Sequence, residues 1–144
     1  MKKGFTLIEL LIVLAIIGIL VTISAFGLRE ARKSARDATR KSDLEQIRSA
    51  LALFRADCGY YPDSPDLVFG APLLGDDGST SCSSGNTYLS EIPQDALEPE
   101  QQYFYARTSP TSYVLCTALE NSTDPAPVGC VSCGVSCNYK VTSL

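Results

Sequence analysis

The pattern of apolar and polar positions changes once along the first third of the chain. From Phe5 to Leu28 the residues are uncharged except for Glu9, and apolar side chains occur on every side of a helix. From residue 28 to residue 57 there is no proline, and apolar residues recur at spacings of three and four, which places them on one helical face. That face consists of Leu44, Ile47, Leu51, Phe54 and Cys58. The pattern predicts one long helix from Phe5 to about Asp57.

The rest of the chain predicts short strands and loops. Gly59 and Pro62 stop the helix, and the segment 62–85 is rich in turn residues. We expect a short helical turn over 86–95. The segments 102–107 and 112–120 alternate side chains to two faces and flank a turn at Pro110, which predicts an antiparallel hairpin. Residues 138–142 add a possible edge strand, so the expected fold class is α+β.

The first apolar run is long enough to cross a membrane. Its 24 residues measure roughly 36 Å as a helix, against about 30 Å for the hydrocarbon core of a bilayer. The alternative is a cleaved secretory signal with small residues at 23–25. Glu9 argues against that alternative, because the apolar region of such a signal is uniformly apolar.

Placing the Glu9 carboxylate inside an apolar, membrane-length run costs free energy. A carboxylate moved toward the middle of a bilayer costs at least about 2.5 kcal/mol, so it is expected to have a partner. No Lys or Arg occurs between Phe5 and Leu28. The cation must therefore be a chain terminus, a lipid headgroup or a group of another subunit, which points to assembly.

The sequence MKKG, followed by FTLIE at 5–9 and the apolar run, resembles the class III signal of type IV prepilins and type II secretion pseudopilins. Residues 48–62 are similar to the end of the long helix in major pseudopilins and related pilins. The resemblance implies that prepilin peptidase cuts between Gly4 and Phe5 and methylates the new N-terminus. It also implies that the Phe5 ammonium pairs with Glu9 of a neighbouring copy in a helical filament.

This resemblance divides the chain into four parts: a leader 1–4, a transmembrane and polymerisation helix 5–28, the outer half of the helix 29–57, and a head 58–144 that contains the hairpin 102–120. It implies a pilin-like fold in which the long helix packs on a small antiparallel sheet. The implied partners are further copies of the chain, prepilin peptidase, an inner-membrane assembly platform, minor pilins, and membrane lipid before assembly. Nucleic acid is a partner only if the filament serves DNA uptake.

Six cysteines lie beyond the apolar run, and no histidine occurs in the chain. They are Cys58, Cys82, Cys116, Cys130, Cys133 and Cys137. An even number of cysteines in a small exported head favours disulfides, of which we expect at least two, in an unspecified pairing. The competing interpretation is a zinc or redox site built on the segment CVSCGVSC at 130–137, which contains a CxxC spacing, with Cys82 or Cys116 as a fourth thiolate.

Charge is distributed unevenly. Residues 29–56 hold eight basic and four acidic side chains, whereas residues 57–144 hold two basic and eleven acidic ones. The basic flank after the apolar run, read by the positive-inside rule alone, places the head in the cytoplasm. We expect the opposite orientation, because the resemblance puts cleavage on the cytoplasmic side and the cysteines suit an oxidising exterior. The chain is then a single-pass inner-membrane protein that later enters an extracellular or periplasmic filament.

Enzymatic chemistry is not indicated. There is no GxSxG or P-loop motif, and no acid pair has the surroundings of a general acid and base. No cofactor is expected, although the resemblance permits calcium in an outer loop. The acids considered for such a site are GDDG at 75–78, Asp63, Asp66, Asp95 and Glu98.

The sequence therefore predicts a structural subunit of a type IV pilus-like filament. Within the same class it leaves open a pseudopilin of a type II secretion system and a subunit of a DNA-uptake pilus. Two hypotheses of other classes remain: a membrane-anchored binding module with a cysteine-rich head, and a tethered cytoplasmic zinc protein.

Overall fold

The computed structural model describes residues 4–143, apart from the side chains of residues 25 and 26. Residues 1–3 of the predicted leader lie outside the described residues. Internal contacts divide the chain after residue 35 into two units, each of which is described by itself. Helix α1, Leu7–Cys58, contributes to both.

In the first unit the apolar part of α1 is exposed, as the side chains of residues 7–24 show. The apolar window near its N-terminus is long enough to cross a membrane, and none of that window is buried within the chain. The helix begins at Leu7 and not at the predicted Phe5. The shift is explained by Thr6, whose side chain caps the helix, so that the residues before it are left outside.

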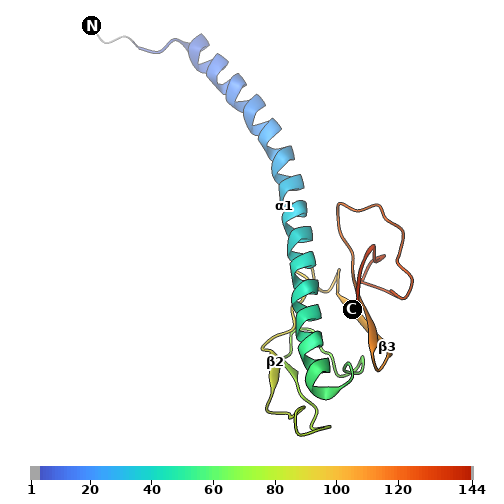
Figure 1. Cartoon of the computed structure of the whole chain (residues 1–144). Helices are drawn as coiled ribbons and strands as arrows, with labels where there is room; N and C mark the ends of the chain where they lie inside the picture. Colours follow the sequence, from blue (N-terminus) through green and yellow to red (C-terminus); the bar gives the residue numbers. More distant parts are fainter. Residues whose placement is uncertain (1–3, 144) are drawn as a thin grey trace. The chain divides into compact units, whose positions relative to one another are not determined.

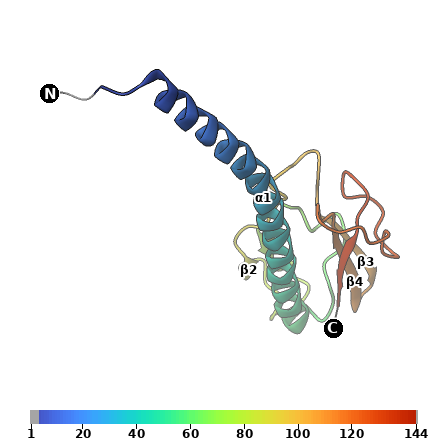
Figure 2. The same cartoon turned by 90° about the horizontal axis from the view of Figure 1, so that it is seen from above.

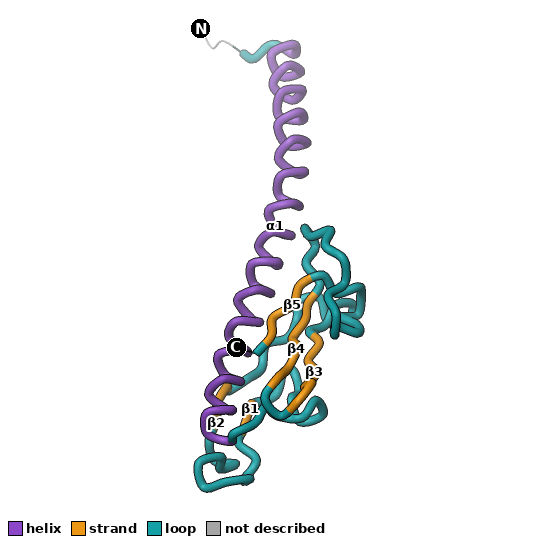
Figure 3. The backbone as a smooth tube through the Cα atoms, turned by 45° about the vertical axis from the view of Figure 1, so that its right-hand side comes forward, coloured by secondary structure: helices purple, strands orange, loops and turns teal. Residues whose placement is uncertain are grey.

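In the second unit the C-terminal part of α1 lies between two small sheets (Figures 1 and 2). On one side is the two-stranded sheet of β1, Leu73–Leu74, and β2, Thr87–Leu89. On the other side is an antiparallel sheet in the order β3-β4-β5 (Figure 3). Its strands are β3, Phe104–Ser109, β4, Ser112–Thr117, and β5, Tyr139–Thr142. The predicted α+β, pilin-like fold is confirmed.

The core forms where the predicted apolar face of α1 meets these sheets. All five residues of that face are at most 9% exposed. They pack with Tyr61, Tyr105, Tyr113 and Leu115, all of which are buried. Tyr61 and Tyr113 meet edge to face with ring centroids 4.7 Å apart, an arrangement that aromatic pairs favour.

The hairpin turns at Pro110 and Thr111, between the paired residues Ser109 and Ser112. Proline suits this position because its ring presets the backbone for a turn. The strands are displaced from the predicted segments, since β3 begins at residue 104 and β4 ends at residue 117. β5 pairs antiparallel with β4, as expected of an edge strand.

The expectation of a helical turn over 86–95 is wrong. Residues 87–89 form β2, in which Leu89 pairs with Leu73 of β1. Tyr88 explains the preference for a strand: its ring packs on Phe54 at 5.2 Å and its hydroxyl donates to Asp57 at 3.0 Å. These tertiary contacts with α1 outweigh the local tendency of the segment.

The helix ends as the sequence indicates. Gly59 adopts φ +84°, and its N–H donates to the carbonyl of Arg55 at 2.8 Å, which is a left-handed C-terminal cap. Cys58, the last helical residue, is joined by a disulfide to Cys82 in the loop between β1 and β2. The end of α1 is therefore fixed covalently to the loop.

Candidate functional site

The first turn of α1 positions Glu9 through Thr6. Glu9 Oε2 accepts hydrogen bonds from the Thr6 N–H at 3.0 Å and from the Thr6 hydroxyl at 2.9 Å. The Thr6 hydroxyl oxygen accepts the N–H of Glu9 at 3.3 Å. This reciprocal arrangement is a capping box, which satisfies amide groups that a helix N-terminus otherwise leaves without a partner.

The capping box corrects the sequence-based view of Glu9. A local partner exists, and the pattern T-x-x-E ahead of an apolar run is the signal that would have predicted it. The partner supplies hydrogen bonds but no positive charge, because residues 4–28 contain no Lys or Arg. Glu9 thus has donors in its own chain and no cation among the described residues around it.

Apolar side chains surround this carboxylate. Five of the residues nearest in sequence are each between 57% and 87% exposed: Phe5, Leu7, Ile8, Leu10 and Leu11. A bare apolar surface of this kind is suited to lipid or to neighbouring helices. The arrangement therefore presents one negative charge on a surface that other apolar segments can cover.

A second cluster of charges lies inside the other unit, around Arg40. The Arg40 side chain is 2% exposed, and its guanidinium binds Asp95 twice, at 2.6 and 3.1 Å. It also donates to Asp37 and to Glu120, each at 2.9 Å. Arg36 binds Glu120 through two contacts of 2.6 Å. The cluster joins α1 to the loop after β2 and to the segment after β4.

The cluster shifts the pKa values of Glu120 and Arg40. Hydrogen bonding from Arg36 is the largest influence on Glu120, and together with Arg40 it lowers the pKa of Glu120 to about 2. Burial by itself lowers the pKa of Arg40, but the hydrogen bonds to Asp95 and Glu120 outweigh burial and raise it. Asp37 accepts the backbone N–H groups of residues 120 and 121, at 2.8 and 2.9 Å. The head is therefore held on the helix by charge as well as by apolar contact.

The cluster around Arg40 was not predicted from the sequence, although a signal for it was present. Asp37 and Arg40 continue the three-and-four spacing of the apolar face toward the N-terminus. A charged residue on a buried stripe must be paired, because an isolated buried charge is strongly unfavourable. The partners Asp95 and Glu120 are distant in sequence, and the spacing does not predict them.

All six cysteines form disulfides. The pairs are Cys58–Cys82, Cys116–Cys130 and Cys133–Cys137. The zinc hypothesis is not supported, because the CxxC at 130–133 contributes its two sulfurs to two different disulfides and retains no thiolate. Two contacts attach the segment around residues 128–130 to the sheet. Lys140 of β5 donates to the carbonyl of Val128 at 3.1 Å, and Cys116 of β4 is bonded to Cys130.

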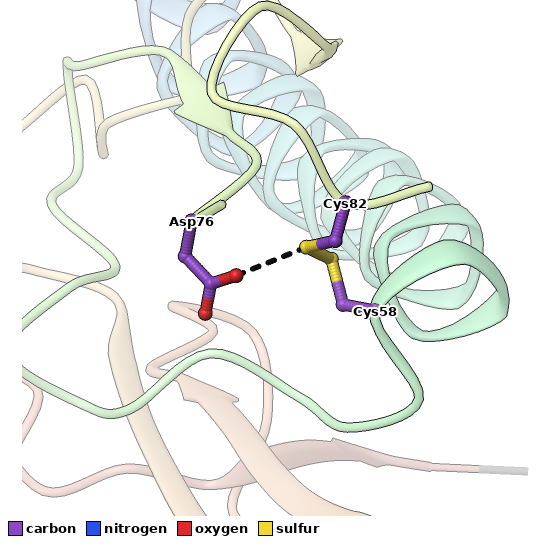
Figure 4. A group of neighbouring side chains, drawn as sticks. All are labelled: Cys58, Asp76 and Cys82. Carbon is purple, nitrogen blue, oxygen red and sulfur yellow. Dashed lines mark hydrogen bonds between the residues drawn. A yellow bond between two sulfur atoms is a disulfide. The ribbon is translucent and has the colours of Figure 1, made fainter. Parts of the chain in front are cut away.

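Among the described residues, one group of three potential metal ligands converges, with its ligand atoms within 4.8 Å of one another (Figure 4). The group consists of Cys58, Asp76 and Cys82. The two sulfurs are bonded to each other and have no proton to donate, so the 3.1 Å approach of Asp76 Oδ1 to Cys82 Sγ is a close contact. Asp76 also accepts the hydroxyl of Tyr60. We therefore assign no metal to this group in the oxidised chain.

The acids considered for calcium are used in different places. Asp95 binds Arg40, and Asp63 forms an ion pair with Arg107. Asp77 accepts the N–H of Ser84 at 2.6 Å, a bond that lowers the pKa of Asp77. Asp63, Asp66 and Asp76 line one pocket together with Arg107, but within residues 4–143 no three of these carboxylates bring their oxygens within 4.8 Å of one another, so we propose no calcium site.

Comparison with known protein families gives two matches along the chain. Residues 1–25 match the prokaryotic N-terminal methylation motif. Residues 28–120 match the family described as type II secretion system protein G. The two matches together cover the apolar helix with Glu9, the ion cluster around Arg40 and the β3-β4 hairpin. No solved structure matches the chain.

Individual relatives fall in two groups. The chain is 41% identical over 86 residues to the major component PilA5 of the type IV narrow pilus of Thermus thermophilus, covering 59% of this chain and 73% of that protein. It is 27% identical over 97 residues to the type II secretion system core protein G of Aeromonas hydrophila, covering 65% of this chain and 66% of the relative. The corresponding protein of Pseudomonas aeruginosa is 29% identical over 104 residues, 71% of this chain and 72% of its own length. The chain thus spans about two thirds of the length of the first of these secretion proteins.

Proposed function

The chain belongs to the type II secretion system protein G family of pilin-like structural proteins, and on this premise we propose that it is stored in a membrane and polymerises into a filament after its leader is removed. The observation that carries the proposal is the N-terminal methylation motif on an exposed apolar run, residues 5–28, whose only acid is Glu9. The relatives include a pilus component and secretion-system proteins, and neither group is favoured over the other. The proposed role is mechanical, and no catalytic step is part of it.

We propose that processing takes place between Gly4 and Phe5. Cleavage converts a peptide nitrogen into a primary ammonium at Phe5, and methylation of that nitrogen preserves its positive charge. The new charge appears one helical turn before Glu9. Phe5 is 87% exposed, so its backbone is not covered by other described parts of the chain.

The ammonium is proposed to pair with Glu9 of a neighbouring copy. A carboxylate without a counterion is expensive at low dielectric, whereas a pair recovers much of the lost solvation energy. Before assembly, the hydrogen bonds from Thr6 reduce the cost of holding Glu9 in the membrane. They also fix the direction of the carboxylate, toward the N-terminal end of the helix. Apolar helix packing then supplies cohesion, and the ion pair sets the axial register of the subunits.

The head is proposed to lie outside the cytoplasm. Three disulfides support an oxidising compartment, where such bonds persist. The basic residues that follow the apolar run oppose this orientation by the positive-inside rule. The disulfides and the methylation motif are the observations on which we base the proposed orientation.

The proposed partners follow from this cycle. They are prepilin peptidase, membrane lipid before assembly, an assembly platform with minor pilins, and further copies of the chain. The chain is correspondingly divided into four functional parts: the leader 1–4, the polymerisation helix 5–28, the outer helix 29–57 and the head 58–144.

Intact-mass measurement of the mature protein tests the processing step. The expected product lacks residues 1–4 and carries one methyl group on Phe5. A mature chain that retains Met1 contradicts the proposal and favours a membrane-anchored binding module.

Replacement of the acid tests the pairing step. Glu9→Ala is expected to leave membrane insertion intact and to abolish sheared filaments, because the ammonium of the next subunit then has no counterion. Glu30→Ala is the matched control: it removes an exposed acid from the same helix, outside the apolar run. Normal filament yield from Glu9→Ala would exclude the pairing mechanism.

A further inference from the structure

Three cations follow one flank of α1 at intervals of seven residues: Lys41, Arg48 and Arg55. Seven residues are close to two helical turns, so the three side chains lie along one line. Each is next to a tyrosine of the head. Lys41 Nζ is 5.5 Å from the ring centre of Tyr139, and Arg55 Cζ is 5.3 Å from that of Tyr61. We call this line of three cations the cationic seam.

A surface groove lies along the seam at Arg48 and Arg55. A groove of about 290 Å³ is lined by Arg48, Ala52, Arg55, Ala56, Tyr61 and Tyr113. Its lining therefore combines two alanines and two tyrosines with two arginine side chains. Among residues 4–143, the acid that forms an ion pair with this part of the seam is Glu45, at 3.2 Å from Arg48, and its side chain is 53% exposed. Arg55 and Lys41 form no ion pair within residues 4–143, so the seam keeps positive charge for a ligand.

The opposite flank of the same helix segment has the opposite sign. Asp43 and Asp57 lie about 200° around the helix from Lys41 and Arg55, two residues further along in each case. Both also contact tyrosines: Tyr103 donates its hydroxyl to Asp43 at 2.7 Å, and Tyr88 donates to Asp57 at 3.0 Å. Here the charges next to the aromatic rings are carboxylates.

The loop between Tyr88 and Tyr103 adds exposed acids to this second flank. It carries Glu91, Glu98 and Glu100, all of which are exposed and form no ion pair among the described residues. We call residues 91–100 the acidic loop. Its buried acid, Asp95, is bound by Arg40 and anchors the loop on α1. The acidic loop is therefore held in place while its three glutamates remain free.

We infer that the cationic seam of one subunit binds the acidic loop of a second copy in the filament. This inference rests on the proposed function and names the head surfaces that meet. Charge complementarity selects the second copy as the occupant, because the seam is basic within a unit of net charge −7, from seven basic and fourteen acidic side chains of residues 36–144. Two different surfaces that bind each other generate a head-to-tail series, which is the geometry that an open helical filament requires.

Nucleic acid is a less suitable occupant. A nucleic-acid-binding unit is usually basic as a whole, whereas this one is acidic and places Glu45 beside Arg48. A long polyanion would also be repelled by the acidic surface on either side of the seam. The carboxylates of a short anchored loop contact only the cations of the seam, so they avoid most of that repulsion.

The first experiment neutralises the seam in the full chain. Arg48→Gln with Arg55→Gln is expected to reduce the filament fraction, measured by shearing and immunoblotting, by about 2- to 30-fold, the range of two exposed ion pairs. Ser42→Glu with Ser49→Glu is the matched control, because it changes the net charge equally on the exposed face of the same helix segment. The reduction is expected to shrink at high ionic strength, where the wild-type pairs are screened.

The second experiment exchanges the charges. Two double variants are each expected to lower filament yield: Arg48→Glu with Arg55→Glu, and Glu91→Lys with Glu98→Lys. The two double variants together in one chain are expected to restore it, because every pair is reformed with reversed sign. A combined variant that is no better than either double variant overturns the inference.

A third experiment locates the contact directly. A photo-crosslinking amino acid at position 52, which lines the groove, is expected to join peptides of the acidic loop from a different subunit. Crosslinks in filaments that consistently avoid residues 91–100 overturn the inference. Loss of DNA binding by the seam variants with unchanged filament yield would do so as well, and would favour nucleic acid as the occupant.

Failure of this inference is distinguishable from failure of the proposed function. If wild-type filaments form and Phe5 is methylated, yet the seam variants assemble normally, only the head contact is refuted. If the wild-type chain forms no filament and keeps residues 1–4, the proposed function itself fails. Tyrosine circular dichroism of each variant shows whether its head is folded.

Discussion

Replacement of Arg40 by methionine is expected to destabilise the head severely. Methionine preserves much of the side-chain volume, so the main effect is electrostatic. The change leaves Asp95, whose side chain is 1% exposed, without a cation, and it removes one of the partners of Asp37 and Glu120. Removal of one member of a buried ion pair costs about 3–5 kcal/mol. Against a typical total of about 5–15 kcal/mol, that is a large part of the stability.

The tyrosines provide a signal that is specific to the head. All seven lie between residues 60 and 139, and the chain has no tryptophan. Urea unfolding of the full chain in detergent, followed by near-ultraviolet circular dichroism, therefore reports on the head without interference from the apolar helix. The Arg40→Met variant should show a lower transition midpoint and an unchanged slope. In thermal unfolding the same loss corresponds to a decrease in Tm on the order of 10–20 °C.

Two further variants separate charge from packing. Lys41→Met removes the adjacent cation, which only contacts the ring of Tyr139, and should cost about 1 kcal/mol or less. Combining Arg40→Met with Asp95→Leu should recover at least half of the loss, because both buried charges are then absent. A decrease below about 1 kcal/mol for Arg40→Met alone would refute the reasoning, since it would mean that the cluster contributes no more than an exposed pair.

Three other predictions concern pH, capping and crosslinks. Because the folded pKa of Glu120 is lowered to about 2, its contribution is complete above the unfolded value of about 4.5 and is lost as pH falls between them. The wild-type head should lose about 1–2 kcal/mol between pH 5 and pH 2, after allowance for solvent screening, and Glu120→Gln should flatten that slope in urea titrations. Thr6→Ala should weaken the helix start by about 1 kcal/mol and speed amide exchange at residues 7–10, with no change in the tyrosine signal; unchanged exchange rates would show that the capping box is dispensable. Replacing both cysteines of Cys58–Cys82, which are 24 positions apart, should cost about 3.5 kcal/mol, against about 2 kcal/mol for Cys133–Cys137, which are 4 positions apart; the reverse order in urea unfolding would contradict the loop-length argument.

Periodicity predicted the long helix well, because one side of the helix must meet a core over many turns. Leu44, Ile47 and Leu51 show this: their spacing gave the buried face, and they are at most 1% exposed. Gly59 and Pro62 gave the C-terminal boundary because their backbone restrictions act locally. The N-terminal boundary was two residues early, since the hydroxyl of Thr6 decides it and apolar character does not.

Features that depend on residues far apart in sequence were not predictable in the same way. Tyr88 turns 87–89 into a strand by contacting Phe54 and Asp57, more than thirty positions earlier in the chain. The partners of Arg40 are likewise 55 and 80 positions away. The even number of cysteines indicated disulfides but not which sulfurs pair, because spacing alone does not specify which loops meet.

The crosslink between Cys58 and Cys82 has a consequence for a fibre under load. When tension pulls on a head, unravelling that starts at the end of the helix would release the following residues one after another. Cys58 and Cys82 are 24 positions apart, so the bond prevents the extension of a segment that would otherwise span roughly 80 Å when stretched out. Each head in the filament is therefore limited in how far it can extend before a covalent bond has to break.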